Sequence, residues 1–159
     1  MPVTFRLRSV TMLPLMLAMI LVASMFSLTQ PADAATRSQR VAKAFHVARA
    51  QLGDPYRYGS SGPKSFDCSG LVYYSFRRAG FAKVPRTSDA QARHARRIKR
   101  SKMRKGDLVF FHNRGNVYHV GVFAGNRNHR RTIIHASRSG TPVKRDPIWT
   151  NSWFAGTLR

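Results

Sequence analysis

The spacing of hydrophobic positions changes once along the chain. Between residues 38 and 80 apolar side chains recur at helical spacing, whereas after residue 105 they come in short runs rich in Val, Ile, Phe and Tyr. The first part predicts a helix that is capped by Ser38 and ends at Gly53. The apolar face of this helix consists of Val41, Phe45, Ala48 and Leu52.

Two further helices are predicted before residue 95. One begins at Cys68, carries Leu71 and Phe76 on its apolar face and stops at Gly80. A shorter one begins at Ser88 or Asp89, after a turn at residues 85–87. Residues 54–65, rich in glycine and proline, are predicted to be loop.

The second part of the chain predicts a sheet. Three runs of strand-forming residues, 107–111, 117–124 and 132–136, are separated by glycine-containing turns and indicate consecutive antiparallel strands. Helices first and strands second are typical of an α+β domain.

The N-terminal segment predicts export. Arg6 and Arg8 precede a long uncharged, apolar stretch that ends in the small-residue pattern Ala32-Asp33-Ala34. We therefore expect a secretory signal peptide over residues 1–34, a domain over residues 35–159, and a location in the periplasm, cell wall or medium. The alternative is an uncleaved anchor helix, which would attach the protein to a membrane.

The charge balance predicts anionic partners. The 28 Lys and Arg residues face only 6 acids, all of them aspartate, which gives a net charge of +22. Eight of the cations lie in a basic run from Arg93 to Lys105. This basic run is either a solvated face or an anchor to an anionic cell-envelope polymer. No nucleic-acid-binding motif is present, so no specific nucleic acid is expected.

The single cysteine is the first candidate for chemistry. One cysteine excludes an internal disulfide framework and any cysteine-rich metal site. Cys68 lies at the predicted start of a helix, where unpaired backbone N–H groups stabilise an anion. We therefore expect a lowered thiol pKa and labelling by iodoacetamide below the pH expected of a free thiol.

Two histidines are candidate partners of the thiol. His119 and His135 interrupt apolar strands, and on neighbouring antiparallel strands their rings can lie side by side. One would take the proton from Cys68 and the other would hold the first in its correct tautomer. The other four histidines are predicted to be ordinary surface residues: His46, His94, His112 and His129.

Six short blocks, in order, resemble the NlpC/P60 family of cell-wall cysteine peptidases. They are residues 52–59, 66–72, 84–88, 106–111, 119–122 and 133–136. The resemblance covers residues 38–159 and implies a papain-like α+β fold and a peptidoglycan endopeptidase without a cofactor or a metal. Such enzymes cut stem peptides, typically between D-Glu and meso-diaminopimelate or Lys.

The resemblance also implies roles for individual residues. Cys68 is the expected nucleophile, His119 the general base and His135 the residue that orients it. The residues expected at the substrate are Tyr56, Asp67, Ser69, Arg86 and Ser88, with Asp67 and Ser69 as candidates for holding the free amine of the stem's L-Ala.

Two departures from the family pattern affect the expected geometry. The segment 125–131 is predicted to be a long basic loop between the histidine strands, and Gly59-Ser60 stands where a Gly-Gly pair is usual. Three other functions stay open: a related amidase or acyl transferase, a non-catalytic cationic wall- or nucleic-acid-binding protein, and a zinc hydrolase. The sequence contains no HExxH-type spacing, which argues against the zinc hydrolase.

Overall fold

The structure, a computed structural model, describes residues 30–158, with side chains from Thr36 onward. Arg37–Arg159 forms one compact unit, separate from the segment that precedes it. The predicted signal peptide lies, up to residue 29, outside the described residues. Within residues 30–158 no helix is long and apolar enough to cross a membrane.

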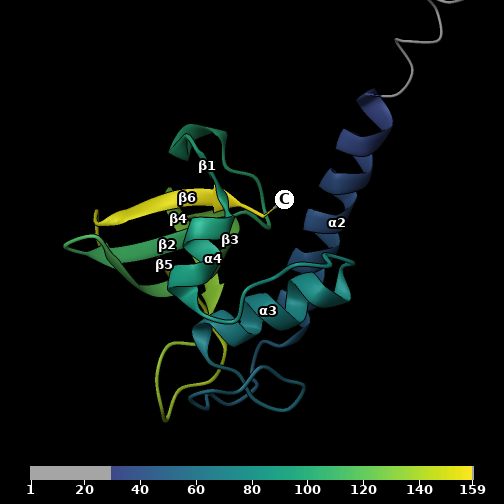
Figure 1. The fold of residues 1–159 in the computed structure, drawn as a ribbon. Coiled ribbons are helices and arrows are strands. Elements are labelled where there is room, and N and C mark those ends of the chain that lie inside the picture. The colour runs from purple at the N-terminus through teal and green to yellow at the C-terminus, as the bar shows by residue number, and fades with distance from the viewer. Residues whose placement is uncertain (1–29, 159) are drawn as a thin grey trace, which may run out of the picture. The chain divides into compact units, whose positions relative to one another are not determined.

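Three helices precede a six-stranded sheet (Figure 1). The helices are α2 (Gln30–Ala50), α3 (Cys68–Arg78) and α4 (Ser88–His94). The strands are β1 (Arg96–Ile98), β2 (Leu108–Asn113), β3 (Asn116–Arg127), β4 (Arg130–His135), β5 (Lys144–Pro147) and β6 (Trp153–Thr157). One 3-10 turn, η1 (Arg100–Lys102), lies between β1 and β2.

All strand pairs are antiparallel, in the order β1-β6-β2-β3-β4-β5. β3 lies inside the sheet, paired with β2 on one side and β4 on the other, and its Val120 and Val122 face the main core. The α+β fold class predicted from the sequence is confirmed.

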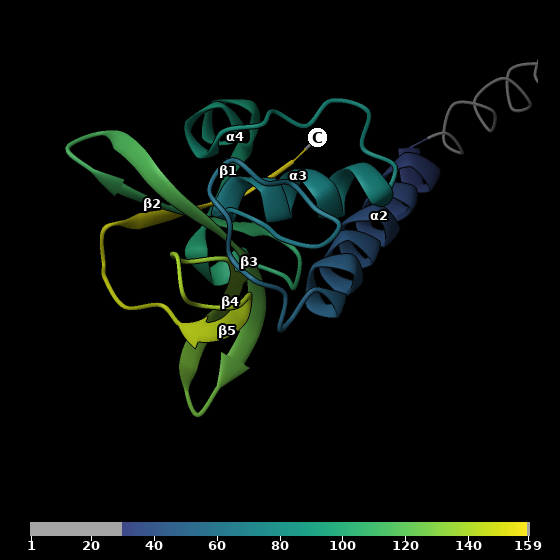
Figure 2. The ribbon, with the colours of Figure 1, turned by 90° about the horizontal axis from the view of Figure 1, so that it is seen from below.

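The sheet buries apolar side chains on both faces. One face, with Leu108, Phe110 and Ile134, packs against α3 and the part of α2 after Arg37, which Figure 2 shows beside each other. The other face carries a smaller cluster that includes Phe111 and Ile133. Because neighbouring residues of a strand point to opposite faces, the apolar runs of β2 and β4 are explained by burial on both sides.

The first predicted helix has different bounds in the structure. α2 begins at Gln30 and ends at Ala50, so Ser38 lies inside the helix and is not its N-cap. The alanine-rich stretch before Ser38 has high helix propensity, and Pro31 is tolerated in a first turn. Leu52, expected on the apolar face, lies past the helix end and is 43% exposed.

The long loop predicted between the histidine strands is absent from this region. β3 and β4 pair as far as Arg127 and Arg130, and only Asn128 and His129 form the connection. Both have positive φ, 49° and 59°, as a tight two-residue hairpin turn requires. The polar and basic residues of this segment are therefore exposed strand residues. Three short strands, β1, β5 and β6, were not predicted.

The start of α3 is fixed by its cap and by one glycine. Asp67 has extended backbone angles, and its side chain accepts a hydrogen bond from the Gly70 amide at 2.6 Å. A Cβ atom at Gly70 would lie 2.0 Å from the carbonyl oxygen of Ser60. The loop before α3 therefore packs against the first turn so closely that only glycine fits.

We predict that Gly70→Ala destabilises the protein by about 1–3 kcal/mol or more, because a Cβ must displace the backbone at Ser60. Helix propensity alone predicts the opposite, a gain of about 1 kcal/mol. The free energy of unfolding in urea measures the effect.

Ser75→Ala on the same helix is the control. The Ser75 hydroxyl is buried and has no hydrogen-bond partner among the described residues, so this variant should be neutral or stabilised. A stabilised Gly70→Ala variant would contradict the tight contact.

Candidate active site

Cys68 is the first residue of α3 and lies against the central strand of the sheet. Its side chain is partly exposed and packs at the edge of the main core. The backbone amides of Cys68 and Ser69 lie close to the sulfur, as does the amide of Val120 on β3. Val120 follows His119 directly in the sequence, so the thiol lies next to the strand segment that carries this histidine.

His119 and His135 form a buried pair, called the histidine pair below. Nε2 of His119 and Nδ1 of His135 are 2.8 Å apart, and the two rings are nearly perpendicular. The residues are 7% and 1% exposed. The pair forms because β3 and β4 are neighbours in the sheet. A Cβ atom at Gly121, two residues after His119, would lie 2.6 Å from the side chain of Ile133, so β3 and Ile133 pack closely beside the pair. The structure thus brings both predicted histidines into direct contact.

A carboxylate extends this pair. Oδ2 of Asp146, on the edge strand β5, lies 3.1 Å from Nε2 of His135. The same oxygen is 2.9 Å from Nζ of Lys144. Among the residues that the structure describes, no group of three His, Cys, Asp or Glu side chains is arranged to hold a metal ion.

Burial keeps the histidine pair uncharged. It lowers the pKa of His119 from 6.5 to about 3, and the proximity of His135 adds to this effect. Burial also lowers the pKa of His135, although its hydrogen bond to Asp146 works in the opposite direction. Both imidazoles are therefore neutral near pH 7, and a neutral imidazole can accept a proton.

The thiol is also neutral at rest, contrary to the expectation from the helix start. Burial is the largest effect and raises the pKa of Cys68, and the negative charge of Asp67 adds to it. The nearby backbone amides lower this pKa but do not outweigh the burial. The thiol and both imidazoles are therefore neutral at rest, so a thiolate has to be formed by proton transfer.

Asp67 and Arg86 form a bidentate ion pair next to the thiol. Nη1 and Nη2 of Arg86 lie 2.9 and 2.7 Å from the two carboxylate oxygens of Asp67. The carboxylate also accepts hydrogen bonds from the amides of Gly59 and Gly70 and from the Ser69 hydroxyl. Burial alone would raise the pKa of Asp67, but the hydrogen bonds from Arg86 and Gly70 hold it below its usual value.

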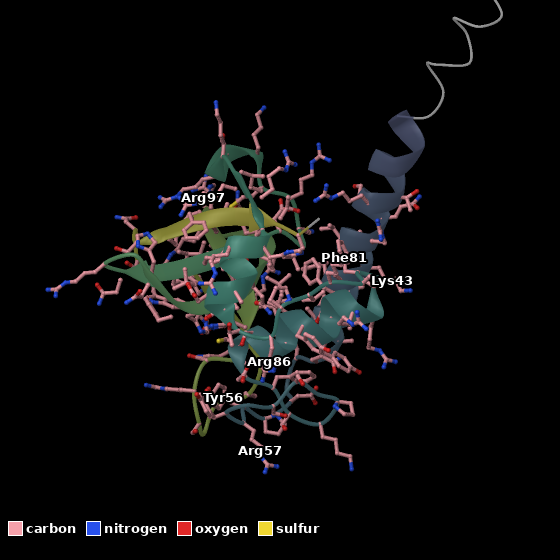
Figure 3. The ribbon with its side chains drawn as sticks, viewed as in Figure 1. Lys43, Tyr56, Arg57, Phe81, Arg86 and Arg97 are labelled. Carbon is pink, nitrogen blue, oxygen red and sulfur yellow. The ribbon has the colours of Figure 1, made fainter. Side chains whose placement is uncertain are left out.

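The other predicted substrate residues have different surroundings. Tyr56 lies at the edge of the core, and Figure 3 places it at the same end of the molecule as Arg86. Burial, followed by the charges of Cys68 and Asp67, raises the pKa of Tyr56. Ser88 donates a hydrogen bond to the carbonyl of Val117 at 3.3 Å, which attaches α4 to β3. Four of the five residues therefore surround Cys68, whereas the Ser88 hydroxyl is engaged with the backbone.

Three residues near the site were not predicted from the sequence. Asp146 contacts His135, and Trp149 stacks on Phe111 at 4.2 Å with its ring 5.7 Å from that of His119. Gln91 is fully buried and donates hydrogen bonds to the carbonyls of Ser69 and Pro85. The scarcity of acids was the one available signal for Asp146, which is one of six.

An open pocket of about 410 Å³ adjoins the histidine pair. It is lined by Arg130, His135, Ser137, Asp146, Pro147 and Trp149.

Of the four histidines predicted to be ordinary surface residues, His46 and His129 are exposed, whereas His94 and His112 are half-buried.

A helix that begins with a cysteine and packs on an antiparallel sheet carrying paired histidines is the arrangement that the resemblance implied. The profile of the NlpC/P60 family matches residues 53–159. The chain belongs to the NlpC/P60 family, and the resemblance in its sequence is confirmed.

Known relatives agree with this assignment. A probable endopeptidase of Corynebacterium glutamicum is 39% identical over 114 residues, which are 72% of this chain and 50% of that protein. The murein DD-endopeptidase MepH of Escherichia coli is 40% identical over 108 residues, 65% of this chain and 38% of that protein. The chain thus spans half or less of the length of these two relatives.

Solved structures show the same fold. The peptidoglycan hydrolase RipB of Mycobacterium tuberculosis superposes with a TM-score of 0.67 and 28% identity, covering 78% of this chain and 67% of that one.

We predict that the rate of Cys68 alkylation by iodoacetamide rises with pH around a midpoint above that of a free cysteine. The reason is that burial raises the pKa of the thiol, so the thiolate forms only at higher pH. Cys68 is the only cysteine, so mass spectrometry of the intact protein reports its labelling directly. The same chain unfolded in urea is the control, since its thiol is solvated. A midpoint below that of the unfolded chain would instead establish a resting thiolate.

Proposed function

We propose that the protein is a peptidoglycan-hydrolysing cysteine endopeptidase that cuts stem peptides. The observation that carries the proposal is the placement of the single thiol at the start of α3, against β3, the strand that bears His119 of the histidine pair. Family membership supports it, as do relatives that are named endopeptidases or a peptidoglycan hydrolase.

In the proposed reaction His119 acts as the general base. It accepts the thiol proton while the sulfur of Cys68 attacks the carbonyl carbon of the scissile amide. The negative charge that develops on the carbonyl oxygen is stabilised by the backbone amides of Cys68 and Ser69. Protonated His119 then gives its proton to the leaving amine, and water hydrolyses the thioester. His135 holds the ring of His119 throughout.

The proposed specificity is for the bond between D-Glu and meso-diaminopimelate or Lys, with the free amine of L-Ala bound near Asp67. The Asp67 carboxylate already accepts five hydrogen bonds. Its contribution to binding an amine is therefore its negative charge. The Ser69 hydroxyl is buried and already bonded to Asp67 and Arg86, so its proposed role is to hold these two charged groups in place. The hydroxyl of Tyr56 is the nearby group that can exchange a hydrogen bond with a substrate.

The proposed location is outside the cytoplasmic membrane, where peptidoglycan lies, and residues 1–34 are the proposed export signal. This location also places the chain among anionic envelope polymers, which a protein of net charge +22 attracts.

We propose that the basic run binds these polymers. Some of its cations serve the fold: Arg97 lies over the ring of Phe154 at 3.8 Å (Figure 3), and Arg100 covers Trp153 at 4.0 Å. Arg93 pairs with Asp89 on α4. The remaining exposed cations are the proposed anchor: Arg96, Lys99, Lys102, Arg104 and Lys105.

We expect Cys68→Ala to lower the cleavage of purified sacculi by more than about a thousandfold, since removing a nucleophile leaves only binding and electrostatic effects. The measurement is mass analysis of the released muropeptides, which also identifies the bond that is cut and separates an endopeptidase from an amidase. His119→Ala should lose as much activity, whereas His135→Asn, which keeps a hydrogen-bonding side chain, should lose less. Persistent hydrolysis by Cys68→Ala would refute the proposed mechanism.

We expect Gln substitutions at Arg96, Lys99, Lys102 and Lys105 together to weaken sedimentation with sacculi. A basic residue near an anionic surface contributes about 1 kcal/mol, so binding should fall at least about tenfold at low salt.

The matched control for the basic run replaces four exposed cations elsewhere with Gln: Lys43, Arg49, Lys64 and Lys83. Hydrolysis of a small soluble stem peptide should be unchanged in both variants. Equal loss of sedimentation in the control would show that net charge acts without a dedicated surface. Binding that does not depend on salt would refute an electrostatic anchor.

A further inference from the structure

Three side chains on three adjacent strands form a continuous chain of hydrogen bonds. Asp146 on β5 contacts Nε2 of His135 on β4 at 3.1 Å, and Nδ1 of His135 contacts Nε2 of His119 on β3 at 2.8 Å. The site therefore extends one residue beyond the cysteine and the histidine pair.

We propose that Asp146 is a positioning residue that fixes the tautomers of both histidines and leaves Nδ1 of His119 as the proton acceptor. This inference rests on the proposed function only in one respect, namely that the proton received by Nδ1 of His119 comes from the Cys68 thiol. The tautomers themselves are a property of the free protein.

The hydrogen-bond partners determine which nitrogen of each ring carries a proton. An ionised carboxylate only accepts hydrogen bonds, so Nε2 of His135 must carry a proton. A neutral imidazole has one N–H, so Nδ1 of His135 is an acceptor and Nε2 of His119 is its donor. The single proton of His119 is then on Nε2, and its Nδ1 keeps the lone pair that a general base needs.

Charge and burial stabilise this arrangement of protons on the two rings near pH 7. Burial would raise the pKa of Asp146, but hydrogen bonds from Lys144 and His135 hold it below its usual value, so the group is ionised. Burial lowers the pKa of both histidines, so neither takes a second proton. The charged groups near Asp146 are Lys144 on its own strand and Arg130, which lines the same pocket from β4.

The sheet register sets the position of the carboxylate. His135 pairs with Lys144 and Ile133 pairs with Asp146, so Asp146 lies diagonally across from His135 on the same face. Nζ of Lys144 meets the same oxygen as His135, which holds this oxygen toward the ring. Without Asp146, no carboxylate holds the proton on Nε2 of His135. An Nδ1–H tautomer of His135 would donate to Nε2 of His119 and so shift the proton of His119 to Nδ1.

Two variants of the full chain separate the hydrogen bond from the charge. Asp146→Ala removes the acceptor, whereas Asp146→Asn keeps an oxygen that can accept from both Lys144 and His135. The matched control is Asp89→Ala, which removes an exposed carboxylate on α4.

The first measurement is the ¹⁵N chemical shifts of the histidine side chains in the free protein near pH 7. We expect His119 and His135 to be Nε2–H tautomers in the wild type, in Asp146→Asn and in Asp89→Ala, and to be mixed in Asp146→Ala. The second is the kinetics on a soluble stem peptide. We expect kcat of Asp146→Ala to fall on the order of ten- to a hundredfold with KM nearly unchanged, and Asp146→Asn to stay close to the wild type.

Unchanged tautomers together with an unchanged kcat in a folded Asp146→Ala variant would overturn the inference. So would an Asp146→Asn variant that loses as much activity as Asp146→Ala while its tautomers are kept, because the charge would then act alone. If an Asp146 variant fails to fold, a wild-type spectrum with Nδ1–H on His119 overturns the inference without it. A wild type that shows the expected tautomers but cleaves no stem peptide would refute the proposed function and leave this inference intact.

Discussion

The bidentate pair between Asp67 and Arg86 is the interaction on which the geometry around the thiol depends. Through five hydrogen bonds the Asp67 carboxylate joins the loop at Gly59, the first turn of α3 and the segment before α4. Because Cys68 follows Asp67 directly, the sulfur is placed by this junction. At the same point, the close contact between Gly70 and the carbonyl of Ser60 packs the loop against the first turn of α3.

The sheet supplies the second half of the site through its register. His119 and His135 meet because β3 and β4 are adjacent, and Asp146 joins them because β5 is the next strand. Both rings are buried, so they stay neutral and their hydrogen bonds gain strength from the low local dielectric. In the proposed reaction, the neutral thiol of Cys68 gives its proton to the neutral ring of His119.

Local patterns in the sequence were sufficient for part of this arrangement. Helical spacing predicted α3, and runs of Val, Ile, Phe and Tyr predicted β2, β3 and β4, because these elements bury apolar side chains. The turn at residues 85–87 predicted the start of α4. β1, β5 and β6 were missed because they are short or lie in polar surroundings, and their strand character comes from pairing with a neighbour. The hairpin at Asn128 and His129 was mistaken for a long loop because its strands are polar beyond the core.

The sequence by itself determined the fold class, the family and the residue types available for chemistry: one cysteine, two histidines in apolar strands, and few acids. Only the tertiary structure decided that Asp146 reaches His135, that Asp67 is already fully hydrogen-bonded, and that burial raises the pKa of Cys68. The reason is physical. Periodicity and helix capping are local along the chain, whereas a pKa and a hydrogen-bond partner depend on burial and on residues that folding brings together.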